Sequence, residues 1–285
     1  MGTLTKIKNI LEMVKFSHTI FALPFAMASL LIASRGLPSP KLLILILAAM
    51  VALRNAAMSF NRYLDADIDA KNPRTASRHI PSGLFSKKFV LGFSLINALF
   101  FIAISYWINP LCFKLSPFAV IVVFLYSFTK RFTHWSHLVL GLALGISPIG
   151  AWMAAVQEIS LPPIVLSIIV LFWVAGFDII YATQDYEFDR KTGLHSLVVK
   201  LGIAKALWLS RLFHFITLGL LLLFGIFLHF GWPYYLSFVV ITGLFVYEHL
   251  LVRPQDLSRV NAAFFNVNGF ISLVFLTGVI LEVCP

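Results

Sequence analysis

The stretch RNAAMSFNRYLDADID, residues 54–69, joins the end of an apolar run to a cluster of carboxylates. Asn61, Asp65 and Asp69 recur every fourth residue within it. On an α-helix such residues lie one above another on a single face, where they repel one another unless a cation joins them. Neither histidine nor cysteine interrupts the stretch, and hard divalent cations prefer oxygen ligands. The spacing predicts a helix that binds Mg2+, the alternative being a solvated acidic helix end.

The composition excludes a soluble domain. Of the 285 residues 60% are hydrophobic and only 12% are charged, and the mean hydropathy is +0.91. A soluble protein of this length carries about 25% charged residues. The net charge of +10 would point to nucleic acid in a soluble protein, but here the basic residues gather in alternate loops and no aromatic RNA-binding motif accompanies them. We expect an all-α integral membrane protein with no nucleic-acid partner.

Long apolar runs fill most of the chain, and a helix needs about 20 apolar residues to cross the hydrocarbon core. We expect nine transmembrane helices around a central cavity that opens to the cytoplasmic side, all in a single domain of residues 1–285. The spans are 18–34, 42–62, 89–108, 111–129, 138–156, 161–181, 207–229, 234–252 and 260–281. Ahead of them, apolar residues recur on one face of residues 4–17, which indicates a helix at the membrane surface.

The positions of the basic residues predict the orientation. Most of the 22 lysines and arginines fall in loops on the N-terminal side, whereas the loops on the other side hold Arg35 and Lys41. The basic segments on the N-terminal side are residues 6–15, 62–88, 130–131, 190–205 and 253–259. The positive-inside rule therefore places the N-terminus in the cytoplasm and, after an odd number of spans, the C-terminus outside. The expected location is the cell (inner) membrane, with membrane lipid as a partner.

Arginines accompany the first carboxylate cluster. Arg54 lies inside the second span, where an arginine costs about 2.5–3.5 kcal/mol on insertion scales and normally faces a cavity or a partner. We expect a polar cavity; the alternative is a side chain that reaches the interface along its own stem. In the loop KNPRTASRHIPSG, residues 71–83, two prolines prevent a continuous helix. Its Arg74 and Arg78 suit bidentate phosphate binding, although basic residues in a cytoplasmic loop are also topology signals.

The sixth span ends in a second acidic stretch, DIIYATQDYEFDRK, residues 178–191. Asp178, Asp185 and Asp189 are seven and four residues apart, which keeps them on one face of a continuous helix. Spans two and six run in the same direction, so we expect both clusters at the cytoplasmic face. Two facing acidic helix ends would repel one another by on the order of several kcal/mol. Two Mg2+ ions bridged by a diphosphate would turn the arrangement into a phosphate site.

Together these residues resemble the UbiA superfamily of intramembrane aromatic prenyltransferases, and the resemblance covers nearly the whole chain. The family's pattern is Asn-Asp-x-x-Asp-x-x-x-Asp on the second helix and Asp-x-x-x-Asp on the sixth. The chain departs from it once, because Arg62 replaces the usual aspartate after the asparagine. The resemblance implies that two Mg2+ ions are held by Asn61, Asp65, Asp69, Asp185 and Asp189.

The same resemblance implies the other site residues. Asp178 and Tyr181 would line the pocket nearer the reacting carbon. The residues expected to act in catalysis are Asp65, Asp69, Asp178, Asp185 and Asp189. The residues expected to bind substrate are Arg54, Asn61, Arg62, Arg74, Arg78, Lys130, Arg131 and Tyr181.

The reaction that the resemblance implies is transfer of a polyprenyl group from a polyprenyl diphosphate to an aromatic acid. Metal ions and basic side chains would neutralise the diphosphate as the allylic C–O bond breaks. Membrane helices rich in phenylalanine, with Phe60, Phe177 and Phe188 as examples, would keep the carbocation from water.

The acceptor would be 4-hydroxybenzoate or a dihydroxynaphthoate, for ubiquinone or menaquinone biosynthesis. The combination of Asn-Arg with Asn-Pro-Arg-Thr is similar to the branch with 4-hydroxybenzoate prenyltransferase-like proteins and the prenyltransferase of the futalosine menaquinone pathway. The alternative is a multi-pass transporter with an acidic cytoplasmic-side site. It is less favoured because the ionisable groups cluster at one membrane face and no inverted repeat is evident.

Overall fold

The structure is a computed structural model that describes residues 3–15 and 18–284. Apart from one isolated bridge between Arg253 and Asp256, these residues contain no β-structure. The helices are α1 (Thr3–Met13), α2 (Thr19–Ser34), α3 (Pro40–Asp69), α4 (Lys87–Ile108), α5 (Pro110–Thr129), α6 (Ser136–Val156), α7 (Leu161–Ala182), η2 (Thr183–Asp185), α8 (Tyr186–Thr192), α9 (Leu197–Leu201), α10 (Ile203–Phe227), α11 (Trp232–Leu251), η3 (Ala262–Val267) and α12 (Asn268–Val283). The prediction of an all-α chain is confirmed.

Eight helical segments of the described chain are long and apolar enough to cross a membrane. They are α3, α4, α5, α6, α7 with its continuation into α8, α10, α11, and η3 with α12. Each coincides in position with one of the second to ninth predicted spans. The first predicted span, residues 18–34, corresponds to α2, an apolar helix of 16 residues. The count of nine, and a central cavity that opens to the cytoplasmic side, stay predictions.

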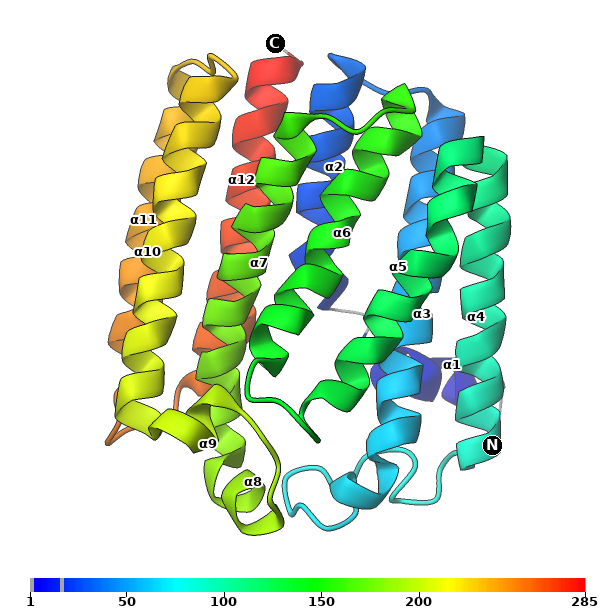
Figure 1. Ribbon diagram of the computed structural model, residues 1–285, viewed down its shortest axis with the longest axis vertical. Coiled ribbons are helices and arrows are strands. Elements are labelled where there is room, and N and C mark those ends of the chain that lie inside the picture. The colour runs from blue at the N-terminus through cyan, green and yellow to red at the C-terminus, as the bar shows by residue number, and fades with distance from the viewer. Residues whose placement is uncertain (1–2, 16–17, 285) are drawn as a thin grey trace. The chain divides into compact units, whose positions relative to one another are not determined.

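The chain forms two compact units whose sequences are interleaved. Unit 1 comprises Met1–Thr19 and Lys41–Phe128, and so contains α1, α4 and nearly all of α3 and α5. Unit 2 comprises Ile20–Pro40 and Thr129–Pro285, and contains nearly all of α2 together with α6 to α12. Figure 1 shows the long helices of each unit running lengthwise. The single domain over residues 1–285 stays a prediction.

Unit 1 is held together where α1 ends against α3 and α4. Met13 and Val14 are buried there beside Val90 of α4 and Tyr63 of α3. In Figure 1, α1 lies across the direction of these longer helices. The contact anchors α1 by its C-terminal end, next to the part of α3 that carries the acidic residues.

The rest of α1 leaves its apolar face open. Leu4 is 83% exposed and Ile7 is 51% exposed, although both are large and hydrophobic. On the polar side Lys8 and Glu12 form an exposed ion pair one turn apart. The predicted helix is confirmed as far as Met13; residues 14–15 form a turn, and residues 16–17 lie outside the described residues. The open apolar face fits the predicted position at a membrane surface, which stays a prediction.

Unit 2 is built around α7, which lies between α6 and α10 (Figure 1). Small residues allow α6 to approach α7 closely. A Cβ atom added at Gly141 would collide with the backbone of Leu171, and one added at Gly145 would collide with Ser167. The two glycines are four residues apart on α6, as in other close helix pairs in membranes. This close approach determines which side chains near the ends of α6 and α7 meet.

A buried polar network ties four helices of unit 2 together. The Asn268 amide donates to a carboxylate oxygen of Glu248 at 2.7 Å and to the backbone oxygens of Ala263 and Phe264 in the π-helical segment η3. The Trp173 indole N–H donates to Asn268 Oδ1 at 2.7 Å. Because a π-helical turn shifts backbone hydrogen bonds, these side-chain bonds stabilise η3 inside an apolar core.

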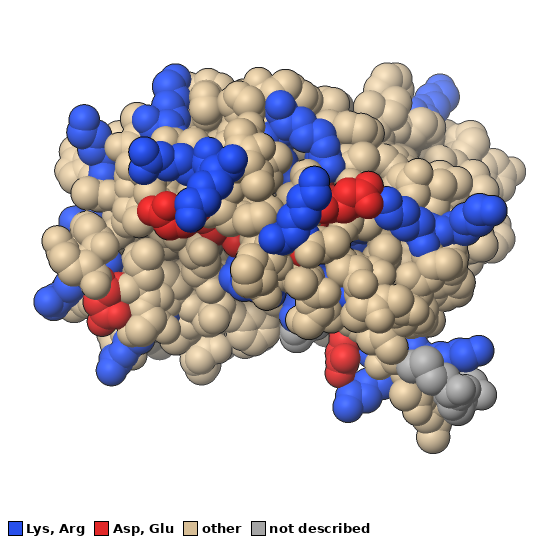
Figure 2. Space-filling model, turned by 90° about the horizontal axis from the view of Figure 1, so that it is seen from below, with Lys and Arg blue, Asp and Glu red and all other residues tan. Residues whose placement is uncertain are grey.

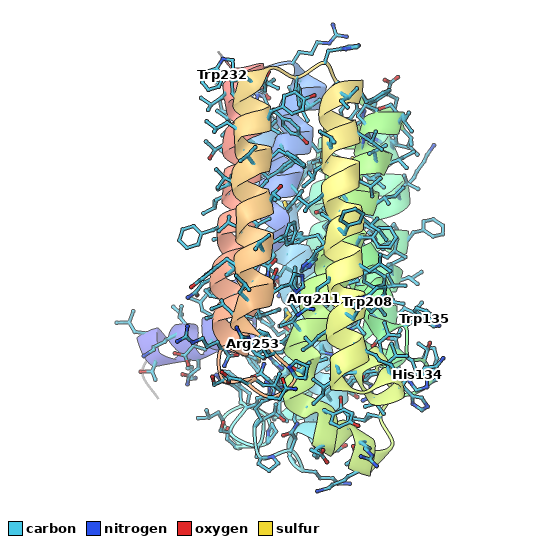
Figure 3. The ribbon with its side chains drawn as sticks, turned by 90° about the vertical axis from the view of Figure 1, so that its left-hand side faces the viewer. His134, Trp135, Trp208, Arg211, Trp232 and Arg253 are labelled. Carbon is cyan, nitrogen blue, oxygen red and sulfur yellow. The ribbon has the colours of Figure 1, made fainter. Side chains whose placement is uncertain are left out.

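Exposed tryptophans lie toward both ends of the long helices of unit 2. Figure 3 shows Trp232 at one end of α11 and Arg253 beyond the other, with Trp135 and Trp208 toward the Arg253 end. Trp232 is 75% exposed, and Trp135 and Trp208 are also open to the surroundings. Tryptophan is enriched at both membrane–water interfaces, so this distribution fits helices that cross a bilayer lengthwise.

Candidate active site

The first acidic segment is part of a single uninterrupted helix, because α3 runs from Pro40 to Asp69. Asn61, Asp65 and Asp69 therefore share one helical face, as predicted. Asp65 is 1% exposed and Asp69 is 4% exposed. The Asn61 amide donates to Asp65 Oδ2 at 3.1 Å, which leaves its carbonyl oxygen as a further oxygen donor. The helix thus presents two buried carboxylates and an amide in a row.

The loop after α3 folds back onto this acidic face. Arg78 Nη1 contacts Asp69 Oδ1 at 2.7 Å, and the Thr75 hydroxyl donates to the Asp69 backbone oxygen at 3.1 Å. Asn72 Oδ1 accepts from the Arg74 backbone N–H at 2.9 Å and so stabilises the turn that starts the loop. The other carboxylate oxygen of Asp69, Oδ2, is buried and has no hydrogen-bond partner within the described residues. An oxygen in that state is available to a cation.

Further cations of unit 1 gather near the same face. Burial lowers the pKa of Lys15, and the positive charges of Arg62 and Arg78 lower it further. Lys15 is therefore close to the predicted phosphate-binding arginines, although it lies far from them in sequence. In the sequence Lys15 belongs to the surface helix and to the positive-inside pattern, because spacing along the chain does not reveal that α1 ends beside α3.

The two arginines predicted within α3 both reach the end of α1. Arg54 Nη2 donates to the backbone oxygen of Lys15 at 2.9 Å, and Arg62 Nε donates to the backbone oxygen of Met13 at 3.4 Å. Carbonyls at a helix C-terminus lack partners within the helix, so cationic side chains stabilise them. Arg54 and Arg62 thus hold α1 in place, and substrate binding by either residue stays a prediction.

The second acidic segment differs from the prediction in its backbone. Asp178 lies in α7, but α7 ends at Ala182, Asp185 belongs to the 3-10 turn η2, and Asp189 lies in the separate helix α8. A 3-10 turn advances by three residues per turn instead of 3.6. The stretch is therefore not one regular α-helix, and a common face for all three aspartates stays a prediction. Asp185 and Asp189 lie on either side of the start of α8.

The predicted basic pair Lys130 and Arg131 lies beside the loop that follows α8. The His195 backbone N–H donates to the Lys130 backbone oxygen at 2.8 Å, and the Leu194 N–H donates to the Asp189 backbone oxygen at 2.9 Å. The structure thus brings the basic segment next to the chain that leaves Asp189. Figure 2 shows acidic side chains flanked by lysine and arginine side chains at the end that carries the loops.

Tyr181 and Phe177, one of the phenylalanines named in the prediction, both contact Phe264 in unit 2. The ring centroids of Tyr181 and Phe264 are 4.3 Å apart, and those of Phe177 and Phe264 are 5.4 Å apart. Phe60, named with Phe177 in the prediction, belongs to unit 1 and stacks on Phe124 at 4.2 Å. The aromatic surface next to Asp178 is thus made by α7 and η3 together, and the position of η3 could not be read from the sequence.

The donor set fits Mg2+ bound together with a phosphate ligand. Within the described residues no three His, Cys, Asp or Glu side chains converge into a ready-made metal site. Mg2+ usually keeps several waters and binds through one or two carboxylates plus substrate phosphates, so a closed protein cage is not required. The α3 face supplies only oxygen atoms, one of them the unpartnered Asp69 Oδ2. The residues present therefore fit the ion.

Residues 22–274 match the UbiA prenyltransferase family. The 4-hydroxybenzoate octaprenyltransferase of Vibrio atlanticus is 33% identical over 255 residues, which cover 89% of this chain and 88% of that protein. The chain belongs to the UbiA prenyltransferase family. It is accordingly a prenyltransferase and a multi-pass membrane protein. The 4-hydroxybenzoate octaprenyltransferase of Photobacterium profundum is 29% identical over 287 residues, 99% of each chain.

Solved UbiA structures share the fold of this family member. The apo structure of a UbiA homolog from Aeropyrum pernix K1 has a TM-score of 0.84 at 31% identity and covers 93% of this chain and 98% of its own. A UbiA homolog from Archaeoglobus fulgidus bound to GPP and Mg2+ has a TM-score of 0.73 at 20% identity, covering 97% of this chain and all of its own (100%). At that identity the second comparison shows the fold alone.

Proposed function

We propose that this UbiA family member transfers a polyprenyl group from a polyprenyl diphosphate to an aromatic acid, 4-hydroxybenzoate or a dihydroxynaphthoate, in quinone biosynthesis. The observation that carries the proposal is the α3 face, where Asn61, Asp65 and Asp69 align and Asp69 Oδ2 has no hydrogen-bond partner within the described residues. The relatives named 4-hydroxybenzoate octaprenyltransferase support the donor and acceptor classes.

Mg2+ would be held by the oxygen-bearing side chains of both acidic segments. The proposed ligands are Asn61, Asp65, Asp69, Asp185 and Asp189. When bound, the ions would neutralise the negative charge that builds on the departing diphosphate. The carboxylates would orient the ions, and Arg78 balances part of the charge of Asp69.

The basic side chains would bind the phosphate oxygens. Arg78 pairs with Asp69 at 2.7 Å, and its side chain is partly exposed at 24%. From this position Arg78 would make a bidentate contact with phosphate. Lys15 would add charge from the end of α1, because the repulsion that lowers its pKa is relieved by an anion. Lys130 and Arg131 would do the same from unit 2.

The reacting carbon would be sheltered from water by aromatic side chains. Tyr181 and Phe177 lie within one turn of Asp178 on α7, and the rings of both contact Phe264 of η3 to form an aromatic cluster. A prenyl cation requires aromatic surroundings of this kind because water would otherwise convert it into the prenyl alcohol. The electron-rich ring of the acceptor attacks the cation there.

The cellular setting is proposed from the charge pattern. A cell (inner) membrane location with the N-terminus in the cytoplasm and the C-terminus outside follows from the positive-inside rule. In this orientation both acidic segments lie at the cytoplasmic side, where soluble aromatic acids are supplied. We also propose that residues 1–285 act as one domain, because the family match spans sequence from both units.

The test is product analysis with purified protein in detergent. Octaprenyl diphosphate is supplied with 4-hydroxybenzoate or with dihydroxynaphthoates, and mass spectrometry identifies the prenylated acid. We expect product with Mg2+ and none after EDTA, with activity restored by excess Mg2+. Full activity in the chelator contradicts the metal assignment, and absence of every prenylated acid contradicts the proposed acceptor class. A transporter would release no diphosphate in this assay, because transport does not cleave the prenyl diphosphate.

A further inference from the structure

A buried histidine that the reaction scheme above does not use contacts Asp178. His137 Nδ1 lies 2.7 Å from Asp178 Oδ2. The His137 side chain is 3% exposed, whereas the Asp178 side chain is 18% exposed. The imidazole therefore stands behind the carboxylate, and the carboxylate is the member of the pair that a substrate can touch.

The helix pair makes this contact rigid. His137, Gly141 and Gly145 follow one another at intervals of four residues and so form a single ridge of α6. The two glycines bring the ridge against the α7 backbone at Leu171 and Ser167, as described above. At such close approach the helices cannot slide without steric overlap. His137 consequently meets Asp178 in one fixed geometry.

The hydrogen bonding indicates which nitrogen carries the proton. His137 Nε2 is buried and has no hydrogen-bond partner within the described residues. A buried N–H without an acceptor costs more than a bare nitrogen lone pair, so the neutral imidazole keeps its hydrogen on Nδ1 and donates it to Asp178 Oδ2. This bond orients the carboxylate and leaves Oδ1 for another proton.

We propose that Asp178 is the base that removes the ring proton of the acceptor, and that His137 is the positioning residue that aims its carboxylate. The inference rests on the proposed function. The C–O bond to diphosphate breaks and the leaving group takes that electron pair; a ring π pair then forms the new C–C bond to the prenyl cation. The C–H electron pair then restores the aromatic ring, and the proton moves to Asp178 Oδ1.

The other carboxylates are poorly suited to this step. Asp65, Asp69, Asp185 and Asp189 are the proposed metal ligands, and a carboxylate bound to Mg2+ has little tendency to accept a proton. Asp178 precedes Asp185 by seven residues, which is about two helical turns, and it lies next to the aromatic surface rather than at the α8 end. Its position and its partner both separate it from the metal set.

The experiment compares His137→Asn with His137→Leu. The two replacements are nearly equal in size, but only asparagine offers an N–H donor the same number of bonds from the backbone as Nδ1. For each variant kcat and KM are measured with octaprenyl diphosphate and with 4-hydroxybenzoate carrying either hydrogen or deuterium on its ring carbons. Melting temperatures in detergent confirm that the two variants are equally folded.

We expect His137→Leu to lower kcat on the order of tenfold with little change in either KM, and to develop a deuterium isotope effect on kcat that is larger than that of the unmodified protein. His137→Asn should restore most of kcat and reduce the isotope effect. Asp178→Asn, which cannot take up the proton, should lower kcat by about 100-fold or more.

Two results would overturn the inference. Equal losses in His137→Asn and His137→Leu with no enlarged isotope effect assign His137 a purely structural role. Unchanged kinetics in all three variants remove Asp178 from the reaction. Both results require that the unmodified protein prenylates the aromatic acid; if it does not prenylate any acid offered, the proposed function fails instead, and the inference fails with it.

Discussion

The two acidic helix ends carry similar residues but are built in different ways. In unit 1 the aspartates continue an unbroken α3, and Asp69 is balanced by Arg78, nine residues further along the chain. In unit 2 the helix breaks at η2, and Asp178 is held by His137, 41 residues away on α6. The first end is organised by local sequence and charge, and the second by packing between helices. A change of charge next to Asp69 should therefore act directly on the α3 end, whereas a change of volume on α6 should reach Asp178 through His137.

Burial separates the two ends as well. Asp65 and Asp69 are buried at the end of α3, whereas α8, which carries Asp189, has no buried residue. Buried carboxylates need a partner for their charge, so the α3 end depends on Arg78 or a metal ion at all times. The residues of α8 are more exposed than the end of α3. The predictions below test these differences, starting with the largest effect.

The largest effect should come from removing one carboxylate at each end. Asp65→Ala and Asp185→Ala each remove a charge that positions an ion when diphosphate leaves, so kcat should fall by two or more orders of magnitude, about 3 kcal/mol. Steady-state kinetics with varied Mg2+ measure the loss. Asp67→Ala is the matched control, because Asp67 lies on another face of α3 and pairs with Lys87 at 2.7 Å. Retained activity in a folded Asp65→Ala variant would contradict the role of the α3 face.

A smaller effect should come from replacing Arg78, the arginine that pairs with Asp69. Arg78→Ala removes a charge-assisted contact with the diphosphate, so KM for the prenyl diphosphate should rise about tenfold while kcat changes less. Arg78→Lys keeps the charge but loses the planar guanidinium group, so its KM should lie between those of the unmodified protein and Arg78→Ala. The KM values are obtained at saturating aromatic acid. If Arg78→Ala lowered kcat alone, Arg78 would act in the transition state only, and its proposed role in binding the prenyl diphosphate would be wrong.

The smallest effect should come from adding side-chain volume between α6 and α7 in unit 2. Gly141→Ala places a methyl group against the Leu171 backbone, which forces α6 away from α7 and should destabilise the protein by about 1–3 kcal/mol. The same shift should lower kcat several-fold by disturbing His137 and Asp178. Gly150→Ala on the same helix adds a methyl group where no atom lies within 4 Å, and should change neither. Thermal melts and kcat are measured for both variants. Equal melting temperatures and equal kcat values would mean that the α6–α7 contact tolerates an added methyl group.

The sequence was sufficient wherever one helix carries the whole pattern. The hydropathy of each run predicted the long helices, and the spacing of Asn61, Asp65 and Asp69 predicted their common face, because both properties depend only on residues a few turns apart. The family followed from the same motif. The sequence also paired Asp185 with Asp189, although it could not show that η2 interrupts the helix before them.

The tertiary structure alone decided the contacts between helices. Three contacts depend on which helix faces meet. Lys15 lies near the arginines of α3, His137 contacts Asp178, and Asn268 bonds to η3. A single sequence does not specify these meetings, because every span is apolar on most of its surface and its periodicity does not distinguish a face toward lipid from a face toward another helix. Close packing at Gly141 and Gly145 selects the neighbour, and only then do polar residues distant in the chain become partners.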